Sequence, residues 1–588
     1  MNVLAPKTLP PEAIAAEWLA ACAGALERRD EAAIAALFLP EGHWRDLLAF
    51  TWQVETVNGA AAIAARLCGR LATVRPTALR LAPHRTAPRR VTRAGEEVVE
   101  AFLAFETEFG SAEGVLRLGA SEGGPGGHRA WILLTALQEI RGHGDITHRQ
   151  RATEKDYSRD FGGANWADKR AAARAYADHD PAAIVVGCGQ AGLGIAARLT
   201  ALGIDTLVID REERVGDNWR RRYHSLTLHN EVHVNHLPYM PFPPTWPVFI
   251  PKDMLANWFE AYVDALELNV WTSTELRSGG WDEAARRWEV TLRRADGTER
   301  VMRPRHLVFA TGVSGIPVMP RLPGQEAFRG TLMHSGAYTN GAAWKGRHAV
   351  VLGTGNSGHD VAQDLHASGA HVTMVQRSPT HIVSVQEAQR VYSIYAEGMP
   401  TDDCDLLATA MPFPVLRRAY QQATALSKEI DRPLLERLER RGFRLSDGID
   451  GCGFQMLYLQ RGGGYYFNVG CSDLVAEGVI DLLQHDRVER LVPEGLRLKD
   501  GSLVPADLIV AATGYENQQE VVRRALGDAI ADRIGPVWGF DAGGELRNMW
   551  RPTAQPGLWF TAGSLAQCRI YSHYLALQIK AREVGLLA

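Results

Sequence analysis

The sequence predicts an α/β protein in which two doubly wound units follow a smaller α+β domain. Two segments repeat the order strand, glycine turn and helix, at residues 184–202 and 350–367. From Pro181 onward, short β-rich runs alternate with glycine turns and helical stretches, which is typical of parallel sheets covered by helices. Before Pro181 the chain instead shows an Ala-rich helical pattern and strands of alternating polarity.

Length and charge limit the classes of function. At about 150 residues per domain, 588 residues indicate two to four domains. The formal net charge of −4 gives no global basic field, so neither nucleic acid nor anionic lipid is an expected partner. No apolar run approaches the ~20 residues that span a bilayer, and the N-terminus lacks the pattern of a signal peptide. These features predict a cytoplasmic protein. The seven scattered cysteines form no CxxC pair, which argues against a disulfide framework and a zinc site.

Residues 1–150 are expected to form the α+β domain. A helix is predicted over Pro11–Arg28. The segment Val99–Phe109 alternates glutamates with large apolar residues, so we expect a strand with one buried face, and with Glu100 on the exposed face. A glycine cluster at Gly123–Gly127 separates two further β-rich runs, as a loop between antiparallel strands would. A curved sheet that holds a helix is the simplest assembly.

The first glycine turn, Gly187-Cys188-Gly189-Gln190-Ala191-Gly192, follows a buried strand and opens a helix that ends at Gly203. In such a turn the first glycine makes the bend, the second lets backbone N–H groups approach a pyrophosphate, and the third permits close packing of helix on strand. The next strand ends at Asp210, where a carboxylate can accept both hydroxyls of a ribose without a 2′-phosphate. This Rossmann-like pattern predicts FAD or NAD.

The second turn, Gly353-Thr354-Gly355-Asn356-Ser357-Gly358, has the same context, but its second strand ends in Arg377 and Ser378. A guanidinium and a hydroxyl suit a 2′-phosphate, so NADP is predicted there. Two dinucleotide sites in one chain indicate that one cofactor reduces the other, as in a flavoprotein oxidoreductase. Because no cysteine lies between Cys188 and Cys404, the flavin cannot pass electrons to a nearby cysteine pair, and dioxygen is the simplest acceptor.

A third motif lies between the two sites. Phe328, Gly330, His334 and Tyr338 match FxGxxxHxxxY, the signature of flavin-containing monooxygenases, which the chain resembles over residues 182–583. Further similarities are Gly216–Trp219, Leu237–Pro243, Ala310-Thr311-Gly312 and Ala512-Thr513-Gly514-Tyr515. Baeyer–Villiger enzymes end the related signature in Trp, and Tyr338 departs from that subgroup.

The resemblance implies the domain plan and the cofactors. Residues 181–340 and 506–588 would form the FAD domain, and 341–505 the NADP domain with an insertion; 151–180 would be a linker. NADPH, with NADH as an option, would reduce FAD, and a C4a-(hydro)peroxyflavin would transfer one oxygen atom of O2 to a small organic substrate, by N- or S-oxidation or by Baeyer–Villiger oxidation of a ketone. The alternatives are an NAD(P)H oxidase that releases H2O2 and a decarboxylating indolepyruvate monooxygenase.

The resemblance also implies site residues. Asn230 falls near the family's active-site Asn, and a loop residue that caps its own backbone is the alternative. His334 is the second catalytic candidate, although an anchoring role in the signature turn fits it better. Besides the glycines and the residues just named in the two turns, the expected cofactor contacts are Gln190, Ala191, Asp210, Arg211, Trp219, Thr311, Asn356, Ser357, Arg377, Ser378, Thr513, Gly514, Tyr515 and Gly563.

The N-terminal segment around Phe38–Asp46 resembles an NTF2/SnoaL-type cone domain, as in type II members of the family. Two roles are open: an active cone with Asp46 as a base, or a structural cap that also forms a homodimer. We expect the cap, because one acid-base residue does not make a site. Four histidines at 224, 229, 233 and 236 suggest a metal, but the Pro-rich sequence after them and the absence of HExxH argue against it, so no metal is expected.

Overall fold

The computed structural model describes residues 9–146 and 161–587. The N-terminal domain is a mixed sheet in the order β2-β1-β7-β6-β5-β3, with β4 beside β5. Its helices are α1 (Pro11–Arg28), α2 (Glu31–Ala36) and α3 (Ala60–Val74). Its strands are β1 (Phe38–Leu47), β2 (Val54–Asn58), β3 (Thr77–Leu81), β4 (Arg89–Arg93), β5 (Glu96–Glu106), β6 (Gly110–Ala120) and β7 (His128–Ile140). The helix expected over Pro11–Arg28 and the loop between two antiparallel strands are confirmed. The assignment to the NTF2/SnoaL type stays a prediction.

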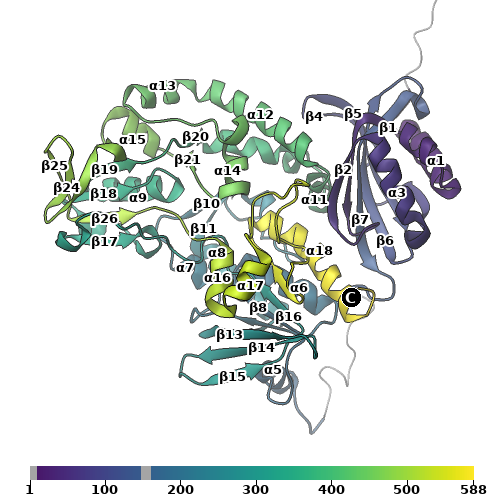
Figure 1. Ribbon diagram of the computed structural model, residues 1–588, viewed down its shortest axis with the longest axis horizontal. Helices are drawn as coiled ribbons and strands as arrows, with labels where there is room; N and C mark the ends of the chain where they lie inside the picture. Colours follow the sequence, from purple (N-terminus) through teal and green to yellow (C-terminus); the bar gives the residue numbers. More distant parts are fainter. Residues whose placement is uncertain (1–8, 147–160, 588) are drawn as a thin grey trace, which may run out of the picture.

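A parallel sheet carries the first glycine turn. Its order is β12-β9-β8-β16-β27, and each neighbouring pair is parallel. The strands are β8 (Ala183–Val186), β9 (Thr206–Ile209), β12 (Asn269–Trp271), β16 (His306–Phe309) and β27 (Leu558–Phe560). Helices α6 (Gln190–Ala201), α8 (Lys252–Ala265) and α18 (Leu565–Glu583) belong to this unit, and α6 packs along α18 (Figure 1).

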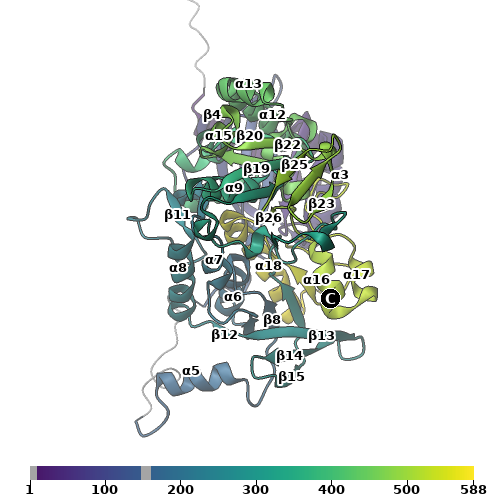
Figure 2. The same ribbon diagram turned by 90° about the vertical axis from the view of Figure 1, so that its left-hand side faces the viewer.

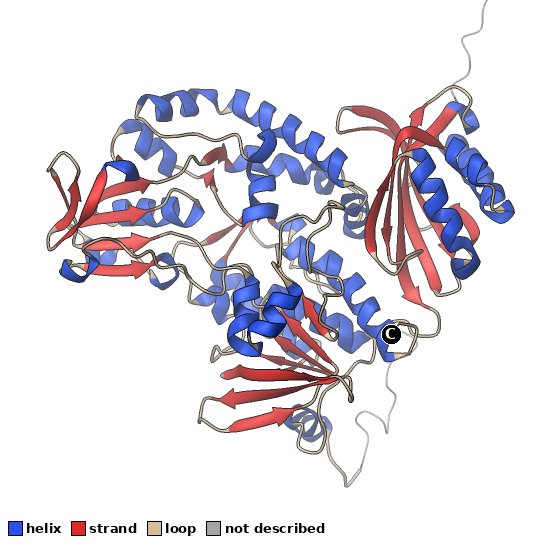
Figure 3. Ribbon diagram, in the orientation of Figure 1, coloured by secondary structure: helices blue, strands red, loops and turns tan. Residues whose placement is uncertain are grey.

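A second parallel sheet, in the order β17-β26-β18-β19-β22, carries the second turn. The strands are β17 (Thr331–His334), β18 (His348–Leu352), β19 (His371–Gln376), β22 (Asp481–Gln484) and β26 (Leu508–Ala511), and α9 (Asn356–Ala367) follows the turn. β17 and β26 pair within this sheet although they lie outside residues 341–505, and the domain boundaries at 340 and 505 stay a prediction. The α/β class with two such sheets is confirmed (Figure 3).

The remaining elements lie around these sheets (Figure 2). The linker predicted at 151–180 contains α5 (Trp166–Ala175), and its residues 151–160 lie outside the described residues. The helical insertion follows β19. Its elements are β20 (His381–Ser384), α10 (Val385–Ala388), the 3-10 segment η7 (Gln389–Ala396), α11 (Thr401–Thr409), α12 (Phe413–Ile430), α13 (Arg432–Arg440), α14 (Gly453–Arg461), β21 (Tyr465–Asn468) and α15 (Cys471–Glu477). Elsewhere lie α7 (Asp217–Arg220), β10 (Thr227–Glu231), β11 (Phe249–Pro251), β13 (Thr274–Asp282), β14 (Arg287–Arg294), β15 (Glu299–Met302), β23 (Val488–Val492), β24 (Gly495–Leu498), β25 (Leu503–Pro505), α16 (Gln518–Leu526) and α17 (Asp528–Ile534).

The N-terminal sheet is covered on both faces. Helices α1 and α3 lie on its outer face, and the insertion approaches the other face at α11 (Figure 1). Arg117 is completely buried there and donates to the Leu407 and Ala410 carbonyls at the end of α11, where a cation is favoured by the helix dipole. Its partner is Glu100, which is 2% exposed. The expectation of an exposed Glu100 face is therefore wrong, because that face is the docking surface for the insertion.

Within the described residues, no helix is both long enough and apolar enough to cross a bilayer. All of the cysteines are free thiols, and six of them are buried.

Candidate cofactor sites and the adjoining cavity

The two glycine turns have nearly the same geometry. Gly187 and Gly353, the first glycine of each turn, have φ of +110° and +115°, in the left-handed region that favours glycine. A Cβ on Gly187 would lie 2.6 Å from the Ala310 carbonyl oxygen, and one on Gly353 would lie 2.5 Å from that of Ala512. The third glycine of each turn, Gly192 or Gly358, would collide with the carbonyl of the first. Both turns are therefore packed against the end of the next parallel strand.

The middle glycines have a different environment. A Cβ on Gly189 would meet only the Asn218 side chain, at 2.8 Å, and one on Gly355 would meet only the Tyr465 carbonyl oxygen, at 3.6 Å. No side chain caps α6 or α9, whose N-cap residues are these two glycines. Each helix therefore presents free N–H groups and its positive dipole end to open space, which suits a pyrophosphate.

Asp210 lies beside the first turn, just after β9. Its carboxylate accepts from the Cys188 N–H at 2.6 Å and from the Glu212 N–H at 2.9 Å. These bonds fix the carboxylate next to the turn, where we predicted a ribose contact. The predicted Arg211 is instead largely exposed and lies 3.6 Å from the Glu212 carboxylate.

A second group of predicted residues joins α6 to the C-terminal segment. Gln190 donates to the Gly563 carbonyl at 3.2 Å and accepts from the Trp219 indole at 3.2 Å. Two buried polar atoms beside this turn have no partner among the described residues, Thr311 Oγ1 and Asn218 Oδ1. Unpartnered buried oxygens next to an uncapped helix N-terminus fit a bound dinucleotide, which would supply the missing partners.

The predicted residues of the second site also surround their turn. Asn356 accepts from the Phe467 N–H at 3.0 Å, which ties the start of α9 to β21. Arg377 and Ser378 are exposed just beyond β19, and among the described residues no carboxylate pairs with Arg377. The preceding Gln376 is buried and accepts from the Arg444 N–H at 2.8 Å. A fixed strand end with a free guanidinium is compatible with a 2′-phosphate.

The signature residues anchor the backbone between the sites. His334 Nδ1 accepts from the Gly336 N–H at 3.0 Å, and Nε2 lies 3.1 Å from the Gly514 carbonyl, which requires the neutral Nε2–H tautomer. Burial also lowers the pKa of His334. Both ring nitrogens bind backbone groups, which supports the anchoring role, and the catalytic role of His334 stays a prediction. The Tyr338 hydroxyl donates to Asp364 of α9 at 2.5 Å.

The Thr513-Gly514-Tyr515 segment links the two parallel sheets. Thr513 donates to the Val318 carbonyl at 2.6 Å, and the Tyr515 ring packs edge-on against His334 with 5.1 Å between centroids. Gly514, between them, accepts from the Val318 N–H at 3.0 Å. These three predicted contact residues therefore follow β26 in the second sheet and connect it to the loop after β16.

Asn230 lies on β10 and is held by residues that the sequence analysis missed. Gln389 of η7 donates to the His229 carbonyl at 2.9 Å and accepts from the Glu231 N–H at 3.3 Å, so it binds the backbone on both sides of Asn230. The Asn230 carbonyl accepts from Asn235 at 2.9 Å, and its side chain interacts with the Tyr392 hydroxyl. No local pattern could identify Gln389, because it is 160 residues away along the chain.

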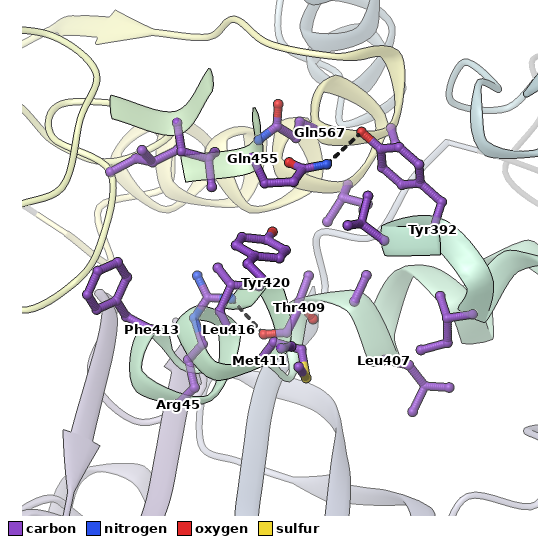
Figure 4. A pocket seen from close by; sticks show the side chains of 18 of the residues that line it. Arg45, Tyr392, Leu407, Thr409, Met411, Phe413, Leu416, Tyr420, Gln455 and Gln567 are labelled. Carbon is purple, nitrogen blue, oxygen red and sulfur yellow. Dashed lines mark hydrogen bonds between the residues drawn. The ribbon is translucent and has the colours of Figure 1, made fainter. Parts of the chain in front are cut away.

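A cavity of about 380 Å³ begins where these elements meet. Ser564 and Gln567 line one end, directly after Gly563, and Tyr392 lines the wall near Asn230. Its walls come from the N-terminal sheet, η7, α11, α12, α14 and the C-terminal segment, and are mostly apolar (Figure 4). Gln455 donates to Tyr392 at 3.3 Å, whereas the Tyr420 hydroxyl has no hydrogen-bond partner among the described residues. None of these lining residues is predictable from the sequence, because they converge only in the tertiary structure.

Asp46 does not line this cavity. It is fully buried, and it accepts from Thr135 Oγ1, Thr51 Oγ1 and the Phe50 and Thr51 N–H groups. Burial raises the pKa of Asp46 to about 6, although these hydrogen bonds act to lower it. The carboxylate is thus committed to a turn within the N-terminal domain. Among the described residues, no group of three or more His, Cys, Asp or Glu side chains converges as a metal site would.

Comparison with known proteins places this geometry in a family. Residues 184–396 match the family model described as pyridine nucleotide-disulphide oxidoreductase. The chain is 30% identical over 338 residues to indole-3-pyruvate monooxygenase YUCCA1 of Oryza sativa subsp. japonica, which covers 57% of this chain and 77% of the relative. The chain belongs to the flavin monooxygenase family.

Other flavin monooxygenases give the same result. The probable indole-3-pyruvate monooxygenase YUCCA10 of Arabidopsis thaliana is 27% identical over 57% of this chain and 81% of its own length. The fold is similar to that of ε-caprolactone-bound cyclohexanone monooxygenase in the Loose conformation, with a TM-score of 0.53 and 18% identity over 69% of this chain and 89% of that one. The prediction of a flavin-dependent monooxygenase is confirmed at this level.

Proposed function

We propose that this flavin monooxygenase binds FAD at the Gly187–Gly192 turn and NADPH at the Gly353–Gly358 turn, and that it oxygenates a small organic substrate in the adjoining cavity. The observation that carries the proposal is the position of the cavity, one end of which follows directly on Gly563, the residue that Gln190 of the FAD turn contacts. When bound, the flavin supplies the chemistry that activates O2.

The chain's own residues would then bind, orient and exclude water. The uncapped N-termini of α6 and α9 bind the two pyrophosphates, and Asp210 distinguishes the first ribose from one with a 2′-phosphate. Gln389 and Asn235 fix Asn230 at the junction of β10 and the cavity. Tyr420 supplies a free hydroxyl that can donate to a substrate oxygen or sulfur.

The N-terminal domain acts in this proposal as a cap that closes the cavity. Arg45, Val54 and Ala94 line its wall, and Arg45 donates to the Thr409 carbonyl of α11 at 2.6 Å (Figure 4). Excluding water from the reacting flavin prevents loss of its activated oxygen as H2O2. Because Asp46 is held within a hydrogen-bonded turn, a structural cap is favoured over a catalytic N-terminal domain with Asp46 as its base.

The test is the ratio of oxygenated product to H2O2 per NADPH consumed by the FAD-loaded protein, over a panel of sulfides, amines and ketones. We expect NADPH oxidation to be coupled to product for at least one class. The names of the curated relatives make indole-3-pyruvate a necessary member of the panel. Release of H2O2 alone with every substrate would favour the NAD(P)H oxidase alternative.

A further inference from the structure

The charges around the cavity are paired internally. Five arginines line it, and each of them lies in an ion pair with a carboxylate of the protein. Arg45 pairs with Glu545, Arg390 with Glu387 and Arg551 with Asp541, whereas Arg93 and Arg117 share Glu100, and Arg93 also contacts Glu397. Among the lining residues, no arginine is without a carboxylate partner.

The pair Arg45–Glu545 stands out in this set, because both of its members line the cavity. Arg45 Nε and Nη2 lie 3.0 and 2.7 Å from the two carboxylate oxygens of Glu545, and both residues are buried. Such a bidentate pair is among the stronger ionic contacts. Glu545 also accepts from Thr56 Oγ1 at 2.9 Å, which fixes it against the N-terminal sheet. The pair joins segments that are 500 residues apart in the sequence.

A carboxylate that entered this cavity would lose its water and meet only arginines that already pair with a carboxylate of the protein. Burying an unpaired charge is costly, whereas burying a neutral polar group that gains one hydrogen bond is tolerated. The Tyr420 hydroxyl offers that bond. An α-keto acid is therefore disfavoured relative to the corresponding ketone.

We propose that Glu545 is a specificity-determining residue: by neutralising Arg45 in the cavity wall, it restricts this monooxygenase to uncharged substrates and excludes carboxylates. The proposal rests on the proposed function, because it concerns the substrate of the same cavity. It predicts that the selectivity depends on one interdomain ion pair and not on cavity size.

The test uses phenylacetone and phenylpyruvate, which differ only in a methyl group replaced by a carboxylate. Binding to the FAD-loaded protein is measured by titration calorimetry, which needs no turnover. We expect phenylpyruvate to bind at least about 100-fold more weakly than phenylacetone. Equal affinities, or failure of phenylacetone to bind, would overturn the proposal.

Glu545→Gln is the decisive variant, because glutamine keeps hydrogen-bonding atoms for Arg45 and Thr56 but leaves the guanidinium charge unpaired. We expect the affinity for phenylpyruvate to rise about tenfold or more while that for phenylacetone stays unchanged. In the double variant with Arg45→Gln, the wild-type discrimination should return. Glu55→Gln is the matched control, because it removes the charge of a carboxylate that an N-terminal-domain arginine, Arg66, binds with two hydrogen bonds, but neither residue lines the cavity.

The outcomes separate the two proposals. An unchanged affinity ratio in folded Glu545→Gln would refute the role of Glu545 and leave the oxygenation reaction standing. Should the variant not fold, equal affinities of the two ligands in wild type still overturn the proposal. Strong discrimination in binding together with only H2O2 as product would support the charge selectivity and contradict the proposed function.

Discussion

Replacing Arg377 with alanine tests which group reads the coenzyme phosphate. The side chain is exposed just beyond β19, and its guanidinium has no carboxylate partner among the described residues, so its charge is available to a 2′-phosphate. A charge-assisted contact contributes about 1.5 to 3 kcal/mol. Because solvent screens this exposed position, we take the lower value, which corresponds to about a tenfold rise in KM for NADPH. KM for NADH should not change, since NADH lacks the phosphate.

The assay is steady-state NADPH and NADH oxidation by the FAD-loaded enzyme at low and high salt. The NADPH effect should shrink as ionic strength rises. Arg347→Ala is the matched control, since Arg347 precedes the amino end of β18 and pairs with Asp507 at 3.4 Å. An equal loss with both coenzymes, or no loss with either, would show that Arg377 does not recognise the phosphate.

Three further predictions concern the space that the cofactor pyrophosphates need, the coupling of NADPH oxidation to product formation, and the free energy of unfolding. Gly189→Val should fold but purify without flavin, whereas Gly355→Val should keep flavin and lose NADPH binding, because each added side chain fills the space of a pyrophosphate. In the protein itself, the first displaces only the Asn218 side chain and the second makes an ordinary contact with the Tyr465 carbonyl; absorbance at flavin wavelengths and coenzyme titration check both. Asn230→Ala and Gln389→Ala should retain FAD and raise H2O2 per NADPH, and unchanged coupling in both would remove Asn230 from the site. Glu100→Gln should lower the free energy of unfolding by about 3 kcal/mol in denaturant titration at neutral pH, because Arg117 loses its buried counter-ion.

The Glu100 prediction also has a pH dependence. Burial alone would raise the pKa of Glu100, but Arg93 and Arg117 outweigh it and hold the pKa at about 2. An acid with a depressed folded pKa contributes stability above its unfolded pKa of about 4.3, and loses that contribution as the pH falls toward 2. The difference between wild type and Glu100→Gln should therefore be full above pH ~5 and vanish near pH 2. A difference that is constant over this range would contradict the assigned pairing.

The two glycine turns were predictable because the interactions that define them are local. The φ of Gly187, the collision that forces a glycine at Gly192, and the strand and helix on either side all lie within one short segment. The same holds for the second turn. The sequence by itself therefore determined the α/β class, the two glycine turns and the family resemblance.

Burial and partners were not predictable where distant segments meet. The alternation around Glu100 correctly indicated a strand, but only the docking of α11 decided that its polar face is buried. His334 carries a side chain that often transfers protons, yet the fold directs both ring nitrogens to backbone groups. Residue type and spacing do not contain this information.

The cavity is the part that tertiary structure alone decided. Arg45, Tyr420 and Gln567 lie on three elements that are separate in the sequence, and their convergence depends on how the N-terminal sheet packs on the insertion and on α18. The pairing of Arg45 with Glu545, and therefore the charge that a substrate meets, arises from the same packing. Local patterns determine which backbone turns can form, whereas the charge and the shape of a binding site depend on which distant side chains the fold brings together.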